Sequence, residues 1–160
     1  MPDTQTYTLD EAHEHFAKAL NGQVWDLLEK PERSKAEGEL MLYAAYASGY
    51  HWLKAGTGLH HQRAEWLITR VSIELGLAEA ALRHASRCLD LTHEFADLMQ
   101  DFDWAYAYEA LARANALAGH RGEALKYLQL AEGRGETIAG EEDQRIFLAD
   151  LNGGQWFGMR

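Results

Sequence analysis

The stretch Gln62–Gly135 decides the fold, because the pattern of its first half recurs in its second. The first half, Gln62–Cys88, reads QRAEWLITRVSIELGLAEAALRHASRC, and the second, Ala105–Ala131, reads AYAYEALARANALAGHRGEALKYLQLA. When the two are aligned, Gly76 falls on Gly119, which is an offset of 43 residues. Each half predicts a helix, a glycine stop and a second helix, so the stretch predicts a repeated helical hairpin.

Small side chains recur in both halves where the two helices of a hairpin are expected to meet. Ala81 and Ala85 lie in the second helix of the first half, and Ala124 and Ala131 lie in that of the second. Only small side chains let two helix backbones approach closely, and short connections make neighbouring helices antiparallel. The pattern therefore predicts two tightly packed antiparallel hairpins.

Helix-capping signals extend this architecture toward the start of the chain. Thr8 with Glu11, and Ser34 with Glu37, have the spacing of a capping box, and Pro31 separates the two helices that they open. Together with the apolar periodicity, these signals predict helix pairs over about 8–55, 59–94 and 103–132, a cap helix over about 141–151, and a glycine-rich, flexible tail over 152–160. Gly133 and Gly135 are expected to break the last helix of the third pair.

Composition places the chain among globular proteins. Its 160 residues are 47% hydrophobic and 25% charged, which suffices for one domain with its own core. The formal net charge of −10 disfavours nucleic acid and anionic membranes as partners. Cys88 is the only cysteine, and no stretch approaches the roughly 20 apolar residues of a membrane span. Since the N-terminus also lacks the pattern of a signal peptide, we expect a soluble, acidic, cytoplasmic protein.

The second half resembles a tetratricopeptide repeat in the order and spacing of its packing residues, namely Tyr108, Leu111, Ala112, Gly119, Ala124, Leu128 and Ala131. The first half resembles it more faintly, through Ile68, Gly76, Ala81, Ala85 and Cys88. The chain departs from that family in its offset, which is 43 rather than about 34 residues, and in lacking the repeat-ending proline. The resemblance implies an all-α fold for residues 1–160: a right-handed stack of three antiparallel helix hairpins plus a C-terminal cap helix.

The chain is also similar to a family of small bacterial helical proteins that has no assigned activity. The segments that carry this similarity are Val24–Arg33, Ala47–Trp52 and Asp103–Ala112. It supports a helical fold and implies no function.

The tetratricopeptide resemblance implies a concave groove lined by the first helix of each hairpin. Repeat-type spacing places these residues on the groove face: Arg63, Trp66, Arg70 and Ile73, followed by Tyr106, Glu109, Arg113 and Ala116. Of these, we expect Arg63, Trp66, Arg70, Tyr106, Glu109 and Arg113 to form the binding site. Arg70 and Arg113 hold the same place in successive halves, so a first hypothesis sets their guanidinium groups side by side, as a site for a carboxylate or a phosphate. The alternative is that both arginines pair with groove carboxylates such as Glu65, Glu74 or Glu109 and bind nothing, as paired surface charges commonly do.

Aromatic side chains are dense, and the set comprises Trp25, Tyr43, Tyr46, Tyr50, Trp52, Trp66, Trp104, Tyr106 and Tyr108. At helical spacing such residues usually belong to the core, and we expect most of this set there. Tyr43, Tyr46 and Tyr50 cannot share one helix face, so we expect some of the three on the groove wall.

Histidines provide a weaker metal or catalytic hypothesis. Three pairs stand one helical turn apart: His84 with Cys88, His61 with Glu65, and His93 with Asp97. Each pair supplies two ligands, whereas a zinc site requires three or four, so we expect no metal and no other cofactor. Arg87 and His93 have the spacing of the arginine–histidine motif of some helical nucleases, but the acidic surroundings oppose the approach of RNA.

Two classes of function remain. The first is a non-enzymatic interaction module that binds a peptide or protein partner in the concave groove. The second is a small-molecule- or metal-binding helical protein, or a hydrolytic enzyme that uses histidines. A groove open along its length favours the first class, and a closed pocket of converging histidines and carboxylates favours the second. The aromatic residues Trp156 and Phe157 of the tail add the hypothesis of self-association as a homo-oligomer.

Overall fold

The computed structural model describes residues 4–160, and all regular structure in that range is helical. The elements are α1 (Leu9–Leu28), α2 (Lys35–Ala55), α3 (Gly58–Glu74), α4 (Ala78–Glu94), the 3-10 helix η1 (Ala96–Leu98), α5 (Asp101–Ala118), α6 (Arg121–Glu136) and α7 (Glu141–Asn152). The all-α prediction is confirmed. Both predicted capping boxes are present, with backbone N–H groups donating to Thr8 Oγ1 at 3.1 Å in α1 and to Ser34 Oγ at 3.1 Å in α2.

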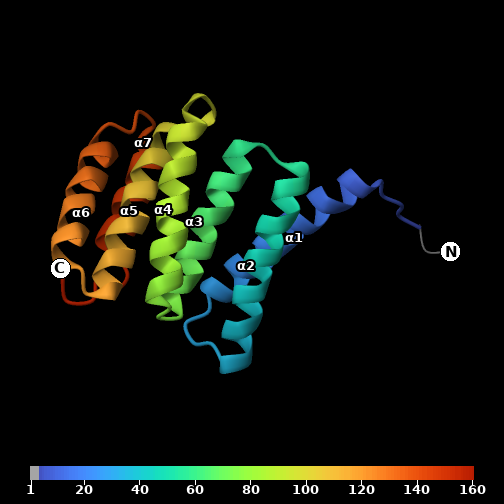
Figure 1. Ribbon diagram of the computed structural model, residues 1–160, viewed down its shortest axis with the longest axis horizontal. Coiled ribbons are helices and arrows are strands. Elements are labelled where there is room, and N and C mark those ends of the chain that lie inside the picture. Colours follow the sequence, from blue (N-terminus) through green and yellow to red (C-terminus); the bar gives the residue numbers. More distant parts are fainter. Residues whose placement is uncertain (1–3) are drawn as a thin grey trace.

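The helices form a stack of hairpins, shown from one side in Figure 1. Each of α1, α3 and α5 packs against the helix that follows it, and successive hairpins meet through α2 with α3 and through α4 with α5. The helices α3 and α5 also touch each other directly, and α7 packs on α5 and α6 at the end opposite α1 and α2. The first helices of the hairpins therefore share one side of the stack, which is the arrangement that a groove requires.

The turns inside the second and third hairpins are duplicates. Gly76 and Gly119 both adopt the left-handed conformation, with φ of 73° and 81°. In each turn the residue after the glycine donates its N–H to a carbonyl five residues earlier: Leu77 to Ser72 at 2.8 Å, and His120 to Asn115 at 2.9 Å. This is the hydrogen bond of a Schellman motif, which satisfies a free carbonyl at the helix end.

Helix α6 runs past the predicted end near residue 132, because its glycines serve packing rather than termination. A Cβ atom on Gly135 would lie 2.6 Å from the ring of Phe147, so only glycine lets α7 approach this closely. Gly133 has open space around it and stays helical. The sequence-based interpretation of both glycines as helix breakers was wrong, since both remain helical. At Gly135, close packing by α7 outweighs the low helix propensity of glycine.

The core consists mainly of small and aliphatic side chains. The four alanines predicted at the helix contacts are fully buried, and Cys88 is as well. In contrast, none of the nine aromatic residues expected mostly in the core is fully buried, and Tyr43 is 65% exposed. Alanine contacts bring the backbones close together and leave no room for these rings between helices, so the rings lie at partly or largely exposed positions.

The tail after α7 folds back onto the stack. Trp156 is only 5% exposed, packs in one core cluster with Phe147 and Leu151, and donates its indole N–H to the Leu151 carbonyl at 2.9 Å. Phe157, next to it, remains 39% exposed. The glycines therefore shape a turn that returns an aromatic ring to the core, and the tail is not the free segment that its composition suggests.

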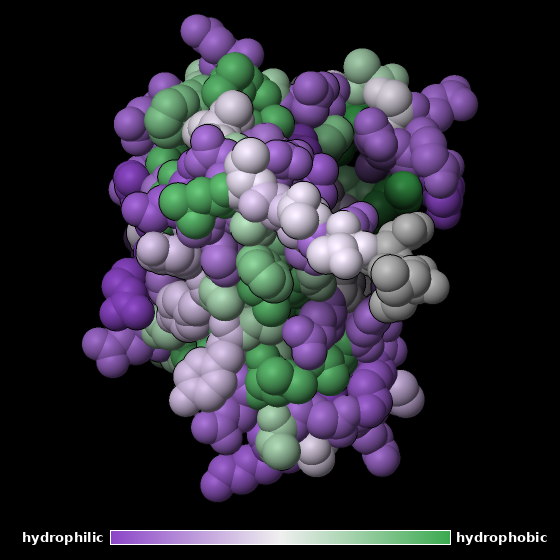
Figure 2. Space-filling model, turned by 90° about the vertical axis from the view of Figure 1, so that its right-hand side faces the viewer, coloured by the Kyte–Doolittle hydropathy of each residue, from purple (hydrophilic) through white to green (hydrophobic). Residues whose placement is uncertain are grey.

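The α1–α2 end carries much of the exposed apolar surface. Figure 2 views this end and shows hydrophobic patches separated by hydrophilic side chains. Phe16, Tyr43, Tyr50 and Leu53 are among the exposed large apolar side chains of these two helices.

No helix within residues 4–160 has the length and hydropathy that a membrane crossing requires.

Candidate functional site

One cavity lies on the side of the stack that the first helices of the hairpins share. It measures about 500 Å³. Every residue of its wall comes from α1, α3, α5 or α7: Asn21, Trp25, Gln62, Arg63, Trp66, Leu67, Phe102, Asp103, Tyr106, Ile146 and Asp150. The second helices α2, α4 and α6 contribute nothing to it. We call this space the groove cavity.

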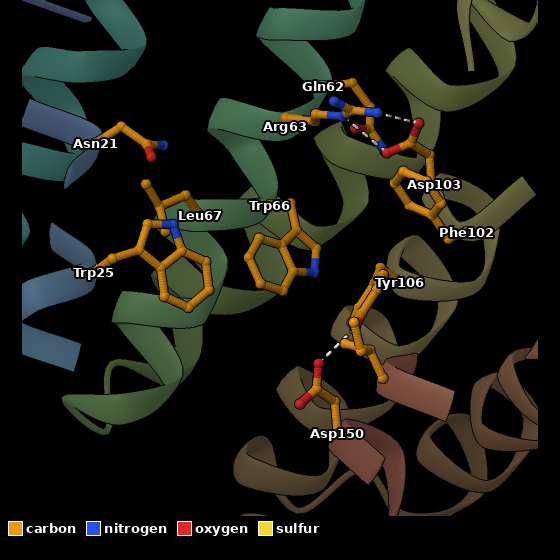
Figure 3. A pocket seen from close by; sticks show the side chains of 11 residues that line it. Asn21, Trp25, Gln62, Arg63, Trp66, Leu67, Phe102, Asp103, Tyr106 and Asp150 are labelled. Carbon is orange, nitrogen blue, oxygen red and sulfur yellow. Dashed lines mark hydrogen bonds and ion pairs between the residues drawn. The ribbon is translucent and has the colours of Figure 1, made fainter. Parts of the chain in front are cut away.

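Three rings of the set form a continuous aromatic surface in the groove cavity. The indole rings of Trp25 and Trp66 have centroids 6.0 Å apart and planes inclined by 24°, and they lie side by side in Figure 3. Tyr106 meets Trp66 edge-on, with centroids 5.6 Å apart. Since all three rings are partly exposed, a bound group can contact them without opening the core.

A bidentate ion pair lies beside these rings. Nε and one terminal nitrogen of Arg63 donate to the two carboxylate oxygens of Asp103, each at 3.0 Å, as the dashed lines in Figure 3 mark. Asp103 is only 4% exposed and also accepts the backbone N–H of Gln100 at 2.9 Å, at the start of α5. The guanidinium of Arg63 lies over Phe102, 5.4 Å from the ring centroid. Arg63 is therefore a neutralised part of the wall rather than a free cation.

A second carboxylate, that of Asp150 on α7, lies at the other side of the groove cavity. Tyr106 donates its hydroxyl to Asp150 Oδ2 at 2.5 Å. Burial raises the pKa of Tyr106 above its usual range, and the hydrogen bond to Asp150 and its charge raise it further. The phenol therefore stays protonated and remains a donor to Asp150 at any physiological pH.

Gln62 brings an unsatisfied polar atom into the wall. Its side chain is 2% exposed, and its Nε2 donates to Thr92 Oγ1 at 3.0 Å. The Thr92 hydroxyl is committed as a donor to the Cys88 carbonyl at 2.7 Å, so it can only accept from Gln62. This fixes the orientation of the amide and leaves Gln62 Oε1 buried without a hydrogen-bond partner among the described residues. Such an acceptor costs about 1–3 kcal/mol unless a donor reaches it.

A smaller cavity of about 170 Å³ continues the groove, because it shares Trp25, Trp66, Tyr106 and Asp150 with the first. The rest of its wall consists of Arg70, Glu109, Arg113, Ala149, Gly153 and Gly154. The six residues expected to form the binding site thus line one or other of these two connected cavities. Ile73 and Ala116, which the repeat spacing places on the same face, line neither cavity and are buried in the core.

Arg113 does not offer the free guanidinium that an anion site requires. It is 6% exposed, pairs with the buried Glu109, and lies 4.1 Å from the ring centroid of Trp156. Its terminal N–H groups donate to backbone carbonyls at the end of α7 and in the tail, namely Asp150 at 2.6 Å, Gly153 at 2.8 Å and Gln155 at 3.0 Å. Burial raises the pKa of Glu109, while the charge and hydrogen bond of Arg113 oppose that rise.

Arg70, at the equivalent place, pairs with Glu74 at 3.2 Å and keeps partial exposure. The structure thus has both arginines paired, which matches the second of the two sequence-based interpretations. The expectation of a joint basic site is not supported, because the N–H groups of Arg113 already donate to backbone carbonyls at the end of α7 and in the tail.

The three tyrosines of α2 lie away from the groove cavity. Tyr46 and Tyr50 border a separate space of about 170 Å³ between α2, α3 and α4. There Tyr46 OH lies 2.8 Å from His84 Nε2, and His84 Nδ1 lies 2.5 Å from Glu65 Oε2. The expectation that some of the three tyrosines reach the groove wall was wrong, since none of them lines either cavity of the groove and α2 is a second helix of a hairpin.

The histidine pairs do not assemble a metal site. Among residues 4–160, no group of three or more histidine, cysteine or acidic side chains is placed to hold a metal ion. Cys88 is fully buried, and burial raises the pKa of its thiol above its usual range. Of the nuclease-like pair, Arg87 lies 3.9 Å from Glu94, and His93 meets the ring of Trp104 edge-on. Each of these contacts has an ordinary structural role.

Sequence reasoning missed four residues of the groove cavity that carry its chemistry. Trp25 was assigned to the core, while Gln62, Asp103 and Asp150 were assigned no binding role at all. Asp150 had one local signal, since it stands one turn after Ile146 on the same face of α7. The roles of Gln62 and Asp103 can be recognised only from the packing of α3, α4 and α5, because each bonds to a residue of another helix.

Comparison with protein-family models, with curated proteins and with solved structures finds no match in any of the three. The class is therefore defined by fold and site alone. This is an all-α protein of stacked helix hairpins, with a cavity on the side that the first helices share.

Proposed function

We propose that this protein is a non-enzymatic interaction module that binds a peptide or an exposed segment of a protein partner along its groove. The observation that carries the proposal is that α1, α3, α5 and α7, with Gly153 and Gly154 of the tail, build two connected cavities. A continuous groove along one side of a helical stack suits an extended chain segment. The partly exposed rings of Trp25, Trp66 and Tyr106 supply anchoring area, as aromatic residues do at interfaces.

A right-handed, tetratricopeptide-like superhelix belongs to the same proposal. Its support is the duplicated turn at Gly76 and Gly119 and the location of the cavities on the first helices. The net charge of −10 disfavours nucleic acid as the partner, and the single buried cysteine fits a reducing compartment such as the cytoplasm.

Selection from a random peptide library displayed on phage tests the proposal. Ile146→Glu adds a charge to the cavity wall at a residue that is already 42% exposed, and Leu125→Glu adds the same charge on the outer helix α6 at 50% exposure. We expect enriched peptides to bind Ile146→Glu at least about tenfold more weakly, while Leu125→Glu binds like the wild type. Absence of enrichment, or equal loss in both variants, would contradict the proposal.

Small-molecule binding is the second candidate, and the volume of the groove cavity favours it. About 500 Å³ falls within the range of small-molecule pockets, roughly 300–1,000 Å³. A thermal-shift screen of small metabolites separates the two functions, because any ligand that binds the native state raises the melting temperature. A metabolite that stabilises the wild type but not Ile146→Glu, together with no peptide enrichment, would favour this second function.

A further inference from the structure

The polar groups that remain unpaired at the groove cavity are acceptors. Gln62 Oε1 has no partner, because the bond from Nε2 to Thr92 fixes the amide. Asp150 accepts the hydroxyl of Tyr106 through Oδ2 and takes no other side-chain hydrogen bond from the described part of the chain. A group that binds among these acceptors must therefore bring donors.

The charge of the cavity points to the same kind of group. Arg63 and Asp103 neutralise each other in a bidentate pair, and Arg113, which donates to the backbone carbonyl of Asp150, is paired with the Glu109 carboxylate. This leaves the carboxylate of Asp150 as the charge of the wall without a cationic side-chain partner among residues 4–160. The chain as a whole carries −10, so a cation is attracted both locally and at long range, whereas an anion is repelled.

Three aromatic rings of the cavity are open to a cation. Arg63 already lies over the cavity residue Phe102, and outside the cavity arginine and lysine groups lie over the rings of Tyr50, Trp104, Tyr127 and Trp156. Within residues 4–160, no such group lies over Trp25, Trp66 or Tyr106. The negative face of an aromatic ring attracts ammonium and guanidinium groups, most strongly for tryptophan.

We propose that the groove cavity receives a basic side chain of the partner, a lysine ammonium or an arginine guanidinium on its apolar stem. The stem packs on Leu67 and the indole rings, and the cationic head lies over the ring faces toward the Asp150 carboxylate, on the Tyr106 side of the cavity (Figure 3). The peptide that carries this side chain rests on the proposed function, whereas recognition of the cation itself does not.

Three probes of equal length and different charge test the cation directly: n-pentylammonium, 1-pentanol and pentanoate. Binding is followed by tryptophan fluorescence and by the indole N–H signals of Trp25 and Trp66 in NMR spectra. We expect pentylammonium to bind about three- to tenfold more tightly than pentanol, and pentanoate more weakly than both. Weaker or equal binding of pentylammonium, or no binding of any probe, would overturn the proposal.

Two variants that remove the same charge at different places locate the effect. Asp150→Asn keeps an acceptor for Tyr106 but removes the charge, and Asp90→Asn removes the same charge from an exposed position on α4. We expect Asp150→Asn to weaken pentylammonium binding about two- to fivefold and to leave pentanol binding unchanged, while Asp90→Asn changes neither. Equal effects of the two variants would mean that the net charge of the protein alone attracts the cation, and would overturn the assignment of the cation site to the groove cavity.

The peptide experiment separates this proposal from the proposed function. If selected peptides bind in the groove and lysine or arginine is replaceable by norleucine without loss, the cation proposal fails and the proposed function stands. If pentylammonium binds as expected but no peptide is selected, the proposed function fails and the cavity still recognises a cation, as a site for a small amine.

Discussion

Arg113 lies with its guanidinium 4.1 Å from the ring centroid of Trp156, and this contact joins α5 to the end of the chain. The same arginine donates to carbonyls at the end of α7 and in the tail, so it acts as a structural clamp. Arg70, its equivalent one hairpin earlier, has no tail to bind and remains partly exposed beside Glu74. Equivalent positions in the two hairpins thus have different roles, and Arg70 serves as a matched control for Arg113.

Removing the clamp is expected to destabilise the fold, while removing its equivalent is not. Arg113→Ala leaves the buried Glu109 without its partner and should lower the free energy of unfolding by about 3–5 kcal/mol. Arg70→Ala breaks an exposed pair and should cost at most about 1 kcal/mol. Urea unfolding followed by circular dichroism gives both values. Similar losses in the two variants would contradict the clamp.

Two glycines of α6 should respond in opposite directions to alanine. Gly135→Ala places a Cβ atom 2.6 Å from the ring of Phe147 and should cost about 1–3 kcal/mol, since α7 must move. Gly133→Ala meets open space and should stabilise the helix by about 0.5–1 kcal/mol. Melting temperatures of the two variants test this, and a loss at Gly133 equal to that at Gly135 would contradict the packing explanation.

Because the two glycine turns have the same geometry, replacing either glycine with alanine should destabilise the protein by the same amount. Gly76 and Gly119 have positive φ with open space around the position of a Cβ atom, so alanine introduces only backbone strain. We expect Gly76→Ala and Gly119→Ala each to lower the free energy of unfolding by about 1–2 kcal/mol, equally within error. Denaturant titration compares them. A large difference between the two would show that the two turns are not equivalent.

Stability should decrease below about pH 6.5 because of two histidines near the α1–α2 end. Burial lowers the pKa of His51 and of His60, assisted by the charge of His13 at His51 and of Arg63 at His60. A lowered pKa means that the folded state binds protons less readily than the unfolded state. The stabilising effect is therefore complete above the unfolded pKa of about 6.5 and is lost as the pH falls through the folded pKa.

The histidine effect is measured as a difference between proteins. Urea midpoints of the wild type and of His60→Gln, taken from pH 8 to pH 5, should diverge in their slope below about pH 6.5, with the shallower decline in His60→Gln. The stacking of His60 on Trp52, with centroids 4.3 Å apart, affects both ends of the range equally. Parallel curves would exclude His60 as a contributor.

Local sequence patterns were sufficient to predict where the helices lie. The same patterns did not show how distant helices pack against each other. Thr8, Ser34, Gly76 and Gly119 act on residues within one turn, so their roles could be predicted from spacing. Gly135 was misread because its role depends on Phe147, which packs on it from α7. Glycine has the same local signature whether it ends a helix or admits a neighbour.

The groove residues could be predicted only in the two helices that belong to the repeated pattern. The six predicted positions come from α3 and α5, whose duplicated pattern fixes which face turns inward. Trp25 and Asp150 belong to α1 and α7, which have no counterpart in the aligned halves and therefore no pattern to transfer. The burial of the arginine donors depends on a tail whose glycines were indistinguishable from those of a flexible end.

The most direct measurement of the central claim maps a selected peptide onto the protein by backbone amide chemical shifts. The account predicts that the shifted amides cluster on α1, α3, α5 and α7 around Trp25, Trp66, Tyr106 and Asp150. Shifts confined to α2, α4 and α6, with the indole signals of Trp25 and Trp66 unchanged, would contradict it.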